Sequence, residues 1–155
     1  MKIVIIGVGN EYRHDDGVGP FILQRLRGLE CAGVSLADSD GEPTALIELW
    51  DGADLAIVVD GVSAHGIAGR VYRLGLHHPS GVSPSAASSH GMPLGEAVQL
   101  ARALGRLPER MLFYGIQVAD VTPGIGLTPS VADAADDVTA EIYDLIQHTL
   151  HPEVP

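Results

Sequence analysis

The segment Lys2–Pro20 gives the clearest indication of the fold and reads Lys-Ile-Val-Ile-Ile-Gly-Val-Gly-Asn-Glu-Tyr-Arg-His-Asp-Asp-Gly-Val-Gly-Pro. It opens with an uninterrupted apolar run, Ile3–Ile6, bounded by Gly7 and Gly9. Such a run between glycines is typical of a strand that is buried on both faces, as in a parallel sheet. A polar loop and then a helical pattern of apolar residues follow, so the segment predicts a strand, a loop and a helix.

Two adjacent carboxylates, Asp15 and Asp16, stand between that loop and the helix. One interpretation is capping, because acidic side chains accept hydrogen bonds from the first helical amides and complement the helix dipole. A functional interpretation is equally open, because loops at the carboxyl edge of an open α/β sheet bind ligands. A dinucleotide site fits less well, since Tyr12 stands where a G-x-G-x-x-G pattern needs its third glycine and the loop is acidic.

Length and composition indicate one globular domain. The chain has 155 residues, of which 46% are hydrophobic and 19% charged, and this composition is sufficient for a packed core. We expect a single domain over residues 1–150 and a short tail over residues 151–155. The net charge of −11 disfavours nucleic acid and anionic membranes as partners and favours cationic ones, metal ions included.

The sequence also predicts a cellular location. The apolar run near the N-terminus is too short for a signal peptide and already forms the first predicted strand. No apolar stretch reaches the length needed to span a membrane. Cys31 is the single cysteine, which disfavours disulfides and structural zinc. We therefore expect a cytoplasmic protein.

The rest of the chain alternates between strand and helix patterns. Apolar periodicity predicts strands at 34–37, 55–59, 70–74 and 110–118 and helices at 18–29, 44–51, 94–104 and from 128 onward. The strand at 70–74 alternates polar and apolar residues, as edge strands do, and residues 77–91 read as a loop rich in Ser, Pro and Gly. The predicted fold is an α/β three-layer sandwich whose mostly parallel central sheet of about five strands is flanked by helices.

Three side chains are expected to meet at one edge of this sheet. Asp16 follows the first strand, Asp60 ends a central strand and His90 lies in a loop that leads into a helix. Two carboxylates and an imidazole suit a divalent ion such as nickel or zinc and leave coordination positions open. Each residue also has an ordinary interpretation, because an aspartate before glycine often forms a turn and a loop histidine is often solvated.

Other residues and chemistries are weaker candidates. Asp40 is a further carboxylate at a strand end, and His14 and His65 lie close enough in sequence to support the site from outside its ligand set. The sequence contains no G-x-S-x-G elbow, H-E-x-x-H pair or P-loop, which disfavours the hydrolase classes that depend on them.

Motifs along nearly the whole chain resemble those of the nickel–iron hydrogenase maturation proteases. The opening motif is specific, and the others follow it in the family's order. The matching segments are Gly7-Val8-Gly9-Asn10, Asp15-Asp16-Gly17-Val18-Gly19, Asp40-Gly41 leading to Thr44, Val58-Val59-Asp60, Ser89-His90 and Gly124-Ile125-Gly126-Leu127-Thr128-Pro129.

The resemblance implies an endopeptidase that removes the C-terminal extension of a hydrogenase large-subunit precursor. It implies that Asp16, Asp60 and His90 form both the metal-recognition site and the catalytic site. The nickel belongs to the precursor, so the protease is expected to have no tightly bound cofactor of its own. We also expect it to work as a monomer. A water molecule activated by a carboxylate, as in an aspartic-type peptidase, is our preferred nucleophile, and nickel acting as a Lewis acid is the competing version.

Two alternatives of different classes stay open. One is a non-catalytic metal-binding module that assembles a nickel enzyme with the same three residues. The other is a small-molecule or nucleotide-binding α/β protein, which the acidic loop disfavours.

Overall fold

The computed structural model describes residues 1–29, 33–77 and 94–152 of the chain. The described elements alternate between strands and helices, as predicted. In chain order they are β1 (Ile3–Val8), the 3-10 turn η1 (His14–Gly17), α1 (Val18–Gly28), β2 (Val34–Ser39), α2 (Pro43–Trp50), β3 (Leu55–Val62), β4 (Val71–His77), α4 (Leu94–Leu104), β5 (Arg110–Gln117) and α5 (Pro129–Leu150).

The described strands form one sheet with the order β2-β1-β3-β5-β4. β2, β1, β3 and β5 run parallel, and β4 pairs antiparallel with β5 at one edge. The chain passes from β1 to its neighbour β2 on one side and then crosses back to β3 on the other side of β1. The strand order therefore reverses beside β1. In open α/β sheets that reversal opens a crevice beyond the carboxyl ends of the strands, where ligands bind.

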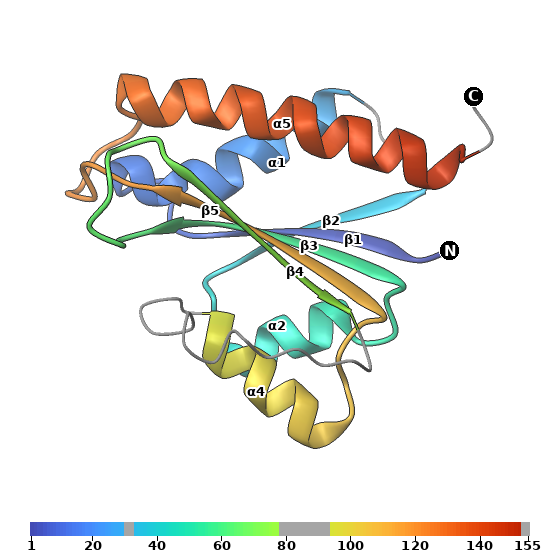
Figure 1. Ribbon diagram of the computed structural model, residues 1–155. Coiled ribbons are helices and arrows are strands. Elements are labelled where there is room, and N and C mark those ends of the chain that lie inside the picture. The colour runs from blue at the N-terminus through green and yellow to red at the C-terminus, as the bar shows by residue number, and fades with distance from the viewer. Residues whose placement is uncertain (30–32, 78–93, 153–155) are drawn as a thin grey trace.

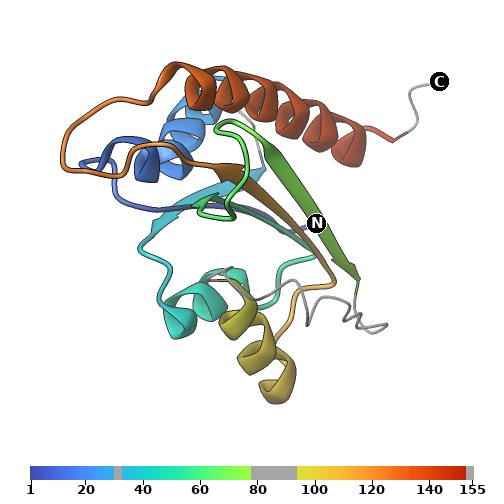
Figure 2. The ribbon, with the colours of Figure 1, turned by 60° about the vertical axis from the view of Figure 1, so that its left-hand side comes forward.

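Helices cover both faces of the sheet. α1 and α5 lie on one face and α2 and α4 on the other, as Figure 1 and the rotated view in Figure 2 show. Alternate side chains of β1 pack into the two cores on opposite faces of the sheet, because successive side chains of a strand point to opposite faces. Ile3 and Ile5 belong to the core with α1 and α5, whereas Val4 and Ile6 belong to the core with α2 and α4. The predicted three-layer sandwich is therefore confirmed.

A glycine brings α1 into direct contact with the sheet. A Cβ atom at Gly19 would lie 2.7 Å from the Val8 nitrogen and 2.8 Å from the Val59 oxygen, which is closer than real Cβ atoms come. Only glycine permits this approach of helix and strand backbones. The start of α1, and the η1 turn before it, are thereby held against the carboxyl ends of β1 and β3.

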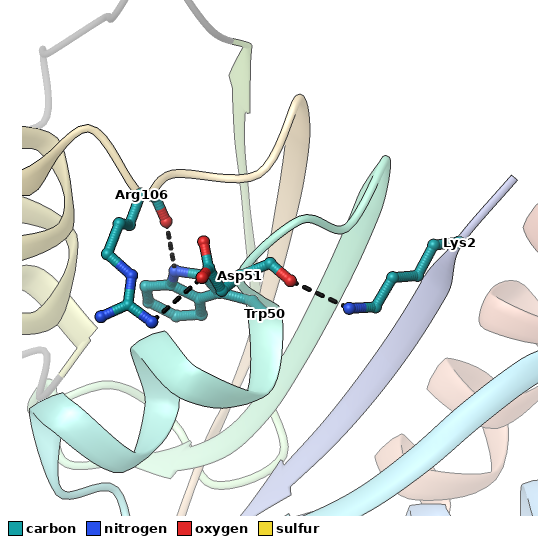
Figure 3. Close-up of polar contacts among 4 residues, drawn as sticks. All are labelled: Lys2, Trp50, Asp51 and Arg106. Carbon is teal, nitrogen blue, oxygen red and sulfur yellow. Dashed lines mark hydrogen bonds and ion pairs between the residues drawn. The ribbon is translucent and has the colours of Figure 1, made fainter.

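At the opposite edge of the sheet, polar contacts join α2 to the segment after α4 and to the start of β1 (Figure 3). The Trp50 indole Nε1 donates to the Arg106 carbonyl at 3.1 Å, and Arg106 Nη2 lies 3.0 Å from the Asp51 carboxylate. Lys2 Nζ donates to the Asp51 carbonyl at 2.9 Å. Trp50 is fully buried, so these contacts cover the core between the sheet and the helices α2 and α4 at the amino ends of the strands.

Several strand boundaries differ from those predicted. β2 continues two residues further than expected, to Ser39. β3 continues through Asp60 to Val62, because residues 60–62 keep pairing with β5. β4 extends to His77, which the sequence assigned to a loop. The rest of that predicted loop, including Ser89 and His90, lies outside the described residues.

Candidate functional site

A pocket of about 230 Å³ lies at the carboxyl edge of the sheet, where the strand order reverses. Its walls come from the ends of β1, β2 and β3 and from η1. Three carboxylates face it, and among the described residues none that lines it is basic. The lining residues are Val8, Gly9, Asn10, Asp16, Asp40, Gly41, Asp60 and Gly61.

Asp60 is the buried carboxylate of the pocket. It pairs with Gly115 inside the sheet, and only 5% of its surface is exposed. Burial raises the pKa of the Asp60 carboxyl to about 7, and the negative charge of Asp16 adds to the rise. A carboxyl with a pKa near neutrality can both accept and donate a proton under cellular conditions, as general acid–base catalysis requires.

Asp16 lies opposite Asp60 on η1 and is partly exposed. Its Oδ2 accepts a hydrogen bond from the Asn10 amide at 2.9 Å, which holds the carboxylate against the loop that follows β1. Gly9 makes this turn possible. Its φ of +137° favours glycine, and a Cβ there would collide with the Asp16 carbonyl oxygen.

Asp40 and Asn10 complete the polar lining of the pocket. Asp40 follows β2 and is exposed, and it enters the site because β2 lies directly beside β1. The sequence marked Asp40 as a weaker candidate, and the structure brings it to the pocket. Asn10 belongs to the opening motif, but the sequence alone indicated no role for it. Its backbone amide donates a hydrogen bond to the Asp16 carboxylate.

Asp15 points away from the pocket and is fully buried. Its Oδ2 accepts from the amides of Ala119 and Asp120 at 2.9 Å each. Its Oδ1 accepts from the Thr128 amide at 2.8 Å, and the Thr128 hydroxyl donates to Oδ2 at 2.9 Å. Burial alone would raise the pKa of Asp15, but these four hydrogen bonds outweigh it and lower the pKa.

Neither aspartate acts as the helix cap that the sequence suggested. Gly17 is the N-cap of α1, while the Asp16 carboxylate binds Asn10 and the Asp15 carboxylate binds the segment between β5 and α5. Thr128 stands at the N-cap position of α5, as predicted, yet its hydroxyl donates to Asp15. The two adjacent aspartates therefore have different roles. Asp15 binds the segment between β5 and α5, and Asp16 faces the pocket.

The structure brings together two of the three predicted site residues. Asp16 and Asp60 line one pocket, and His90 lies outside the described residues. Within residues 1–29, 33–77 and 94–152, no group of three or more His, Cys, Asp or Glu side chains is arranged to hold a metal ion. His14 binds outside the pocket lining, because its Nδ1 lies 3.1 Å from the Gly126 carbonyl. The carboxylates that line the pocket could supply oxygen ligands to a cation.

The comparisons with known proteins all indicate the same family. A family model described as hydrogenase maturation protease matches residues 24–145. The hydrogenase 2 maturation protease of Escherichia coli (strain K12) is 27% identical over 158 residues, which cover 100% of this chain and 96% of that protein.

Solved structures share the fold over nearly the whole chain. The hydrogenase maturating endopeptidase HybD from E. coli superposes with a TM-score of 0.77 at 21% identity, covering 96% of this chain and 94% of that one. A hydrogenase 2 maturation peptidase from a Thaumarchaeota archaeon gives a TM-score of 0.70 at 23% identity, with 99% and 100% coverage. In the described part of the chain, no helix is both long and apolar enough to cross a membrane.

Proposed function

The chain belongs to the hydrogenase maturation protease family, and we propose that it removes the C-terminal extension of a nickel–iron hydrogenase large-subunit precursor. The observation that carries the proposal is the acidic pocket at the carboxyl edge of the sheet, which Asp16 and Asp60 line together. A pocket with three carboxylates attracts a cationic group, and nickel held in the precursor is such a group.

In this proposal the nickel ion is part of the substrate. Asp16 and Asp60 supply oxygen ligands to it, and His90 supplies a nitrogen ligand as the third member of the set. Recognition of the ion fixes the position of the scissile peptide bond relative to the pocket. A precursor without nickel lacks this anchor, so the protease cuts only metal-loaded precursor.

The proposed reaction is hydrolysis of the aspartic type. One carboxylate takes a proton from water while the water oxygen attacks the carbonyl carbon of the peptide bond. The same proton then passes to the leaving nitrogen, so the products are a carboxylic acid and a free amine. Asp16 and Asp60 are the candidates for this step, because both line the pocket in which the ion is recognised.

A processing assay tests these roles. Purified wild type, Asp16→Asn and Asp60→Asn would each be mixed with nickel-loaded precursor, and cleavage would be followed on gels and by mass spectrometry. Asp137→Asn is a matched control, because Asp137 is exposed on α5, away from the pocket lining. We expect the control to cut normally and both pocket variants to lose at least 100-fold in rate. Full activity of either pocket variant would refute the roles given to these carboxylates.

A further inference from the structure

Exposed apolar side chains gather beside the pocket on two segments that are far apart in the sequence. Tyr12 is 62% exposed in the loop after β1, and Val121 and Ile125 are 37% and 76% exposed in the segment between β5 and α5. We call these three side chains the apolar rim. Exposed large apolar side chains that gather in one place commonly mark a surface for another protein.

The two segments that carry the apolar rim are bound to each other. The Gly124 amide donates to the Tyr12 carbonyl at 2.9 Å, and Arg13 pairs with Gly124 as an isolated bridge. Arg13 Nε donates to the Val121 carbonyl at 3.1 Å, and the buried Asp15 carboxylate holds the same segment from beneath. Both views show this segment beside the start of α1 (Figures 1 and 2). A rim fixed in this way loses little conformational entropy when a partner binds.

The apolar rim is continuous with the acidic pocket. Asn10 lines the pocket, and its side-chain Oδ1 accepts from the Tyr12 amide at 2.9 Å. Two residues of chain span at most about 7 Å, so Tyr12 lies next to the pocket wall. The exposed carboxylate of Glu11 and the partly exposed carboxylate of Asp120 stand within the same two segments, together with the exposed Arg13, which binds the Val121 carbonyl. A partner that covers the rim therefore meets apolar side chains bordered by negative charge.

We propose that the apolar rim is the docking surface for the precursor's own polypeptide chain, an inference that rests on the proposed function. The matching partner segment carries apolar side chains that cover Tyr12, Val121 and Ile125. Basic side chains next to them face Glu11, Asp120 and the pocket carboxylates. Charge complementarity supports this occupant, because the chain carries a net charge of −11 and the described residues that line its pocket include three carboxylates and no basic side chain.

Steady-state kinetics on nickel-loaded precursor separate docking from chemistry. Tyr12→Ala and Ile125→Ala each remove an exposed side chain, so the fold is expected to survive. We expect each to raise KM about tenfold, as loss of one buried apolar anchor does, and to leave kcat unchanged at saturating precursor. The matched control is Leu104→Ala, because Leu104 is 55% exposed at the end of α4, two residues before the Arg106 cluster of Figure 3 at the opposite edge of the sheet.

An unchanged KM in both rim variants would overturn the proposal, and so would an equal rise in KM for Leu104→Ala. Direct binding to uncut precursor, measured by surface plasmon resonance with the same variants, keeps this test separate from the proposed activity. Wild type that binds through the apolar rim but never cuts would refute the peptidase function and leave the docking surface supported. Wild type that forms a dimer in ultracentrifugation, and becomes a monomer on Ile125→Ala, would overturn the proposal in favour of a second copy as the occupant.

Discussion

Replacing Asp60 by asparagine should make the protein more stable and less active at the same time. The buried carboxylate has a pKa of about 7 in the folded chain, against 3.8 for an ordinary aspartate. At about 1.36 kcal/mol per pH unit, this difference corresponds to roughly 4 kcal/mol of folding free energy. Asparagine has nearly the same shape and carries no charge, so it avoids the cost of holding an ionised group in the sheet.

The sign of the pH dependence follows from where the proton is bound. Between pH 4 and pH 7 the folded chain keeps a proton on Asp60 that the unfolded chain has released, so a rising pH destabilises the wild type over this interval. Above about pH 7 Asp60 is ionised in both the folded and the unfolded chain, so the loss of stability no longer changes with pH. The advantage of Asp60→Asn is therefore close to zero at pH 4 and grows to as much as about 4 kcal/mol at pH 8.

Urea unfolding followed by circular dichroism at pH 4.5, 6 and 8 would measure this difference. The control is Asp137→Asn, because substitution of an exposed surface residue changes the free energy of unfolding little. If Asp60→Asn were less stable than wild type at pH 8, or equally shifted at all three pH values, the reasoning about the buried carboxylate would be wrong. Loss of precursor processing in the same stabilised variant would identify Asp60 as a residue that trades stability for function.

Three further substitutions test the structure around the site. Asp15→Ala removes an acceptor from four donors, among them the Thr128 amide, and should lower the free energy of unfolding by about 3 kcal/mol in urea at pH 7. Because hydrogen bonds hold the pKa of Asp15 below its usual value, this loss should be largest above pH 3.8 and should shrink as the carboxylate is protonated; a loss that grows as the pH falls would contradict the ionised anchor. Gly124→Ala should lower the melting temperature by several degrees, since its φ is +149° and a Cβ would collide with the His14 ring; an unchanged melting temperature would count against that contact. Trp50→Phe leaves the Arg106 carbonyl without its indole donor and should cost about 1 kcal/mol in the same urea assay, whereas a change in processing would contradict its position opposite the pocket.

Local patterns in the sequence were sufficient to predict most elements of the fold. The run Ile3–Ile6 reads as a strand buried on both faces, and it is one. The alternation over 70–74 indicates an edge strand, and β4 is at the edge. Its antiparallel direction was not predicted, because direction depends on how the chain returns to the sheet rather than on the residues of the strand itself.

Contacts between residues far apart in the chain could not be predicted from the sequence, and some of them shape the site. The pairing of Asp15 with Ala119 and Thr128 spans more than 100 residues, so the sequence offered only helix capping or ligand binding as its role. Asp40 joins the pocket because β2 packs beside β1, which the sequence alone did not establish. The placement of Asp16 and Asp60 at one edge was predictable, since parallel strands align their carboxyl ends.

The most direct test of the account compares nickel-loaded and nickel-free precursor in one processing experiment. The same large-subunit precursor would be prepared in both forms, its nickel content measured, and each form incubated with the wild-type protein before gel and mass analysis. We expect a shortened C-terminus in the nickel-loaded sample and an intact chain in the nickel-free sample. Equal cleavage of both forms, or no cleavage of a precursor with confirmed nickel, would contradict this expectation.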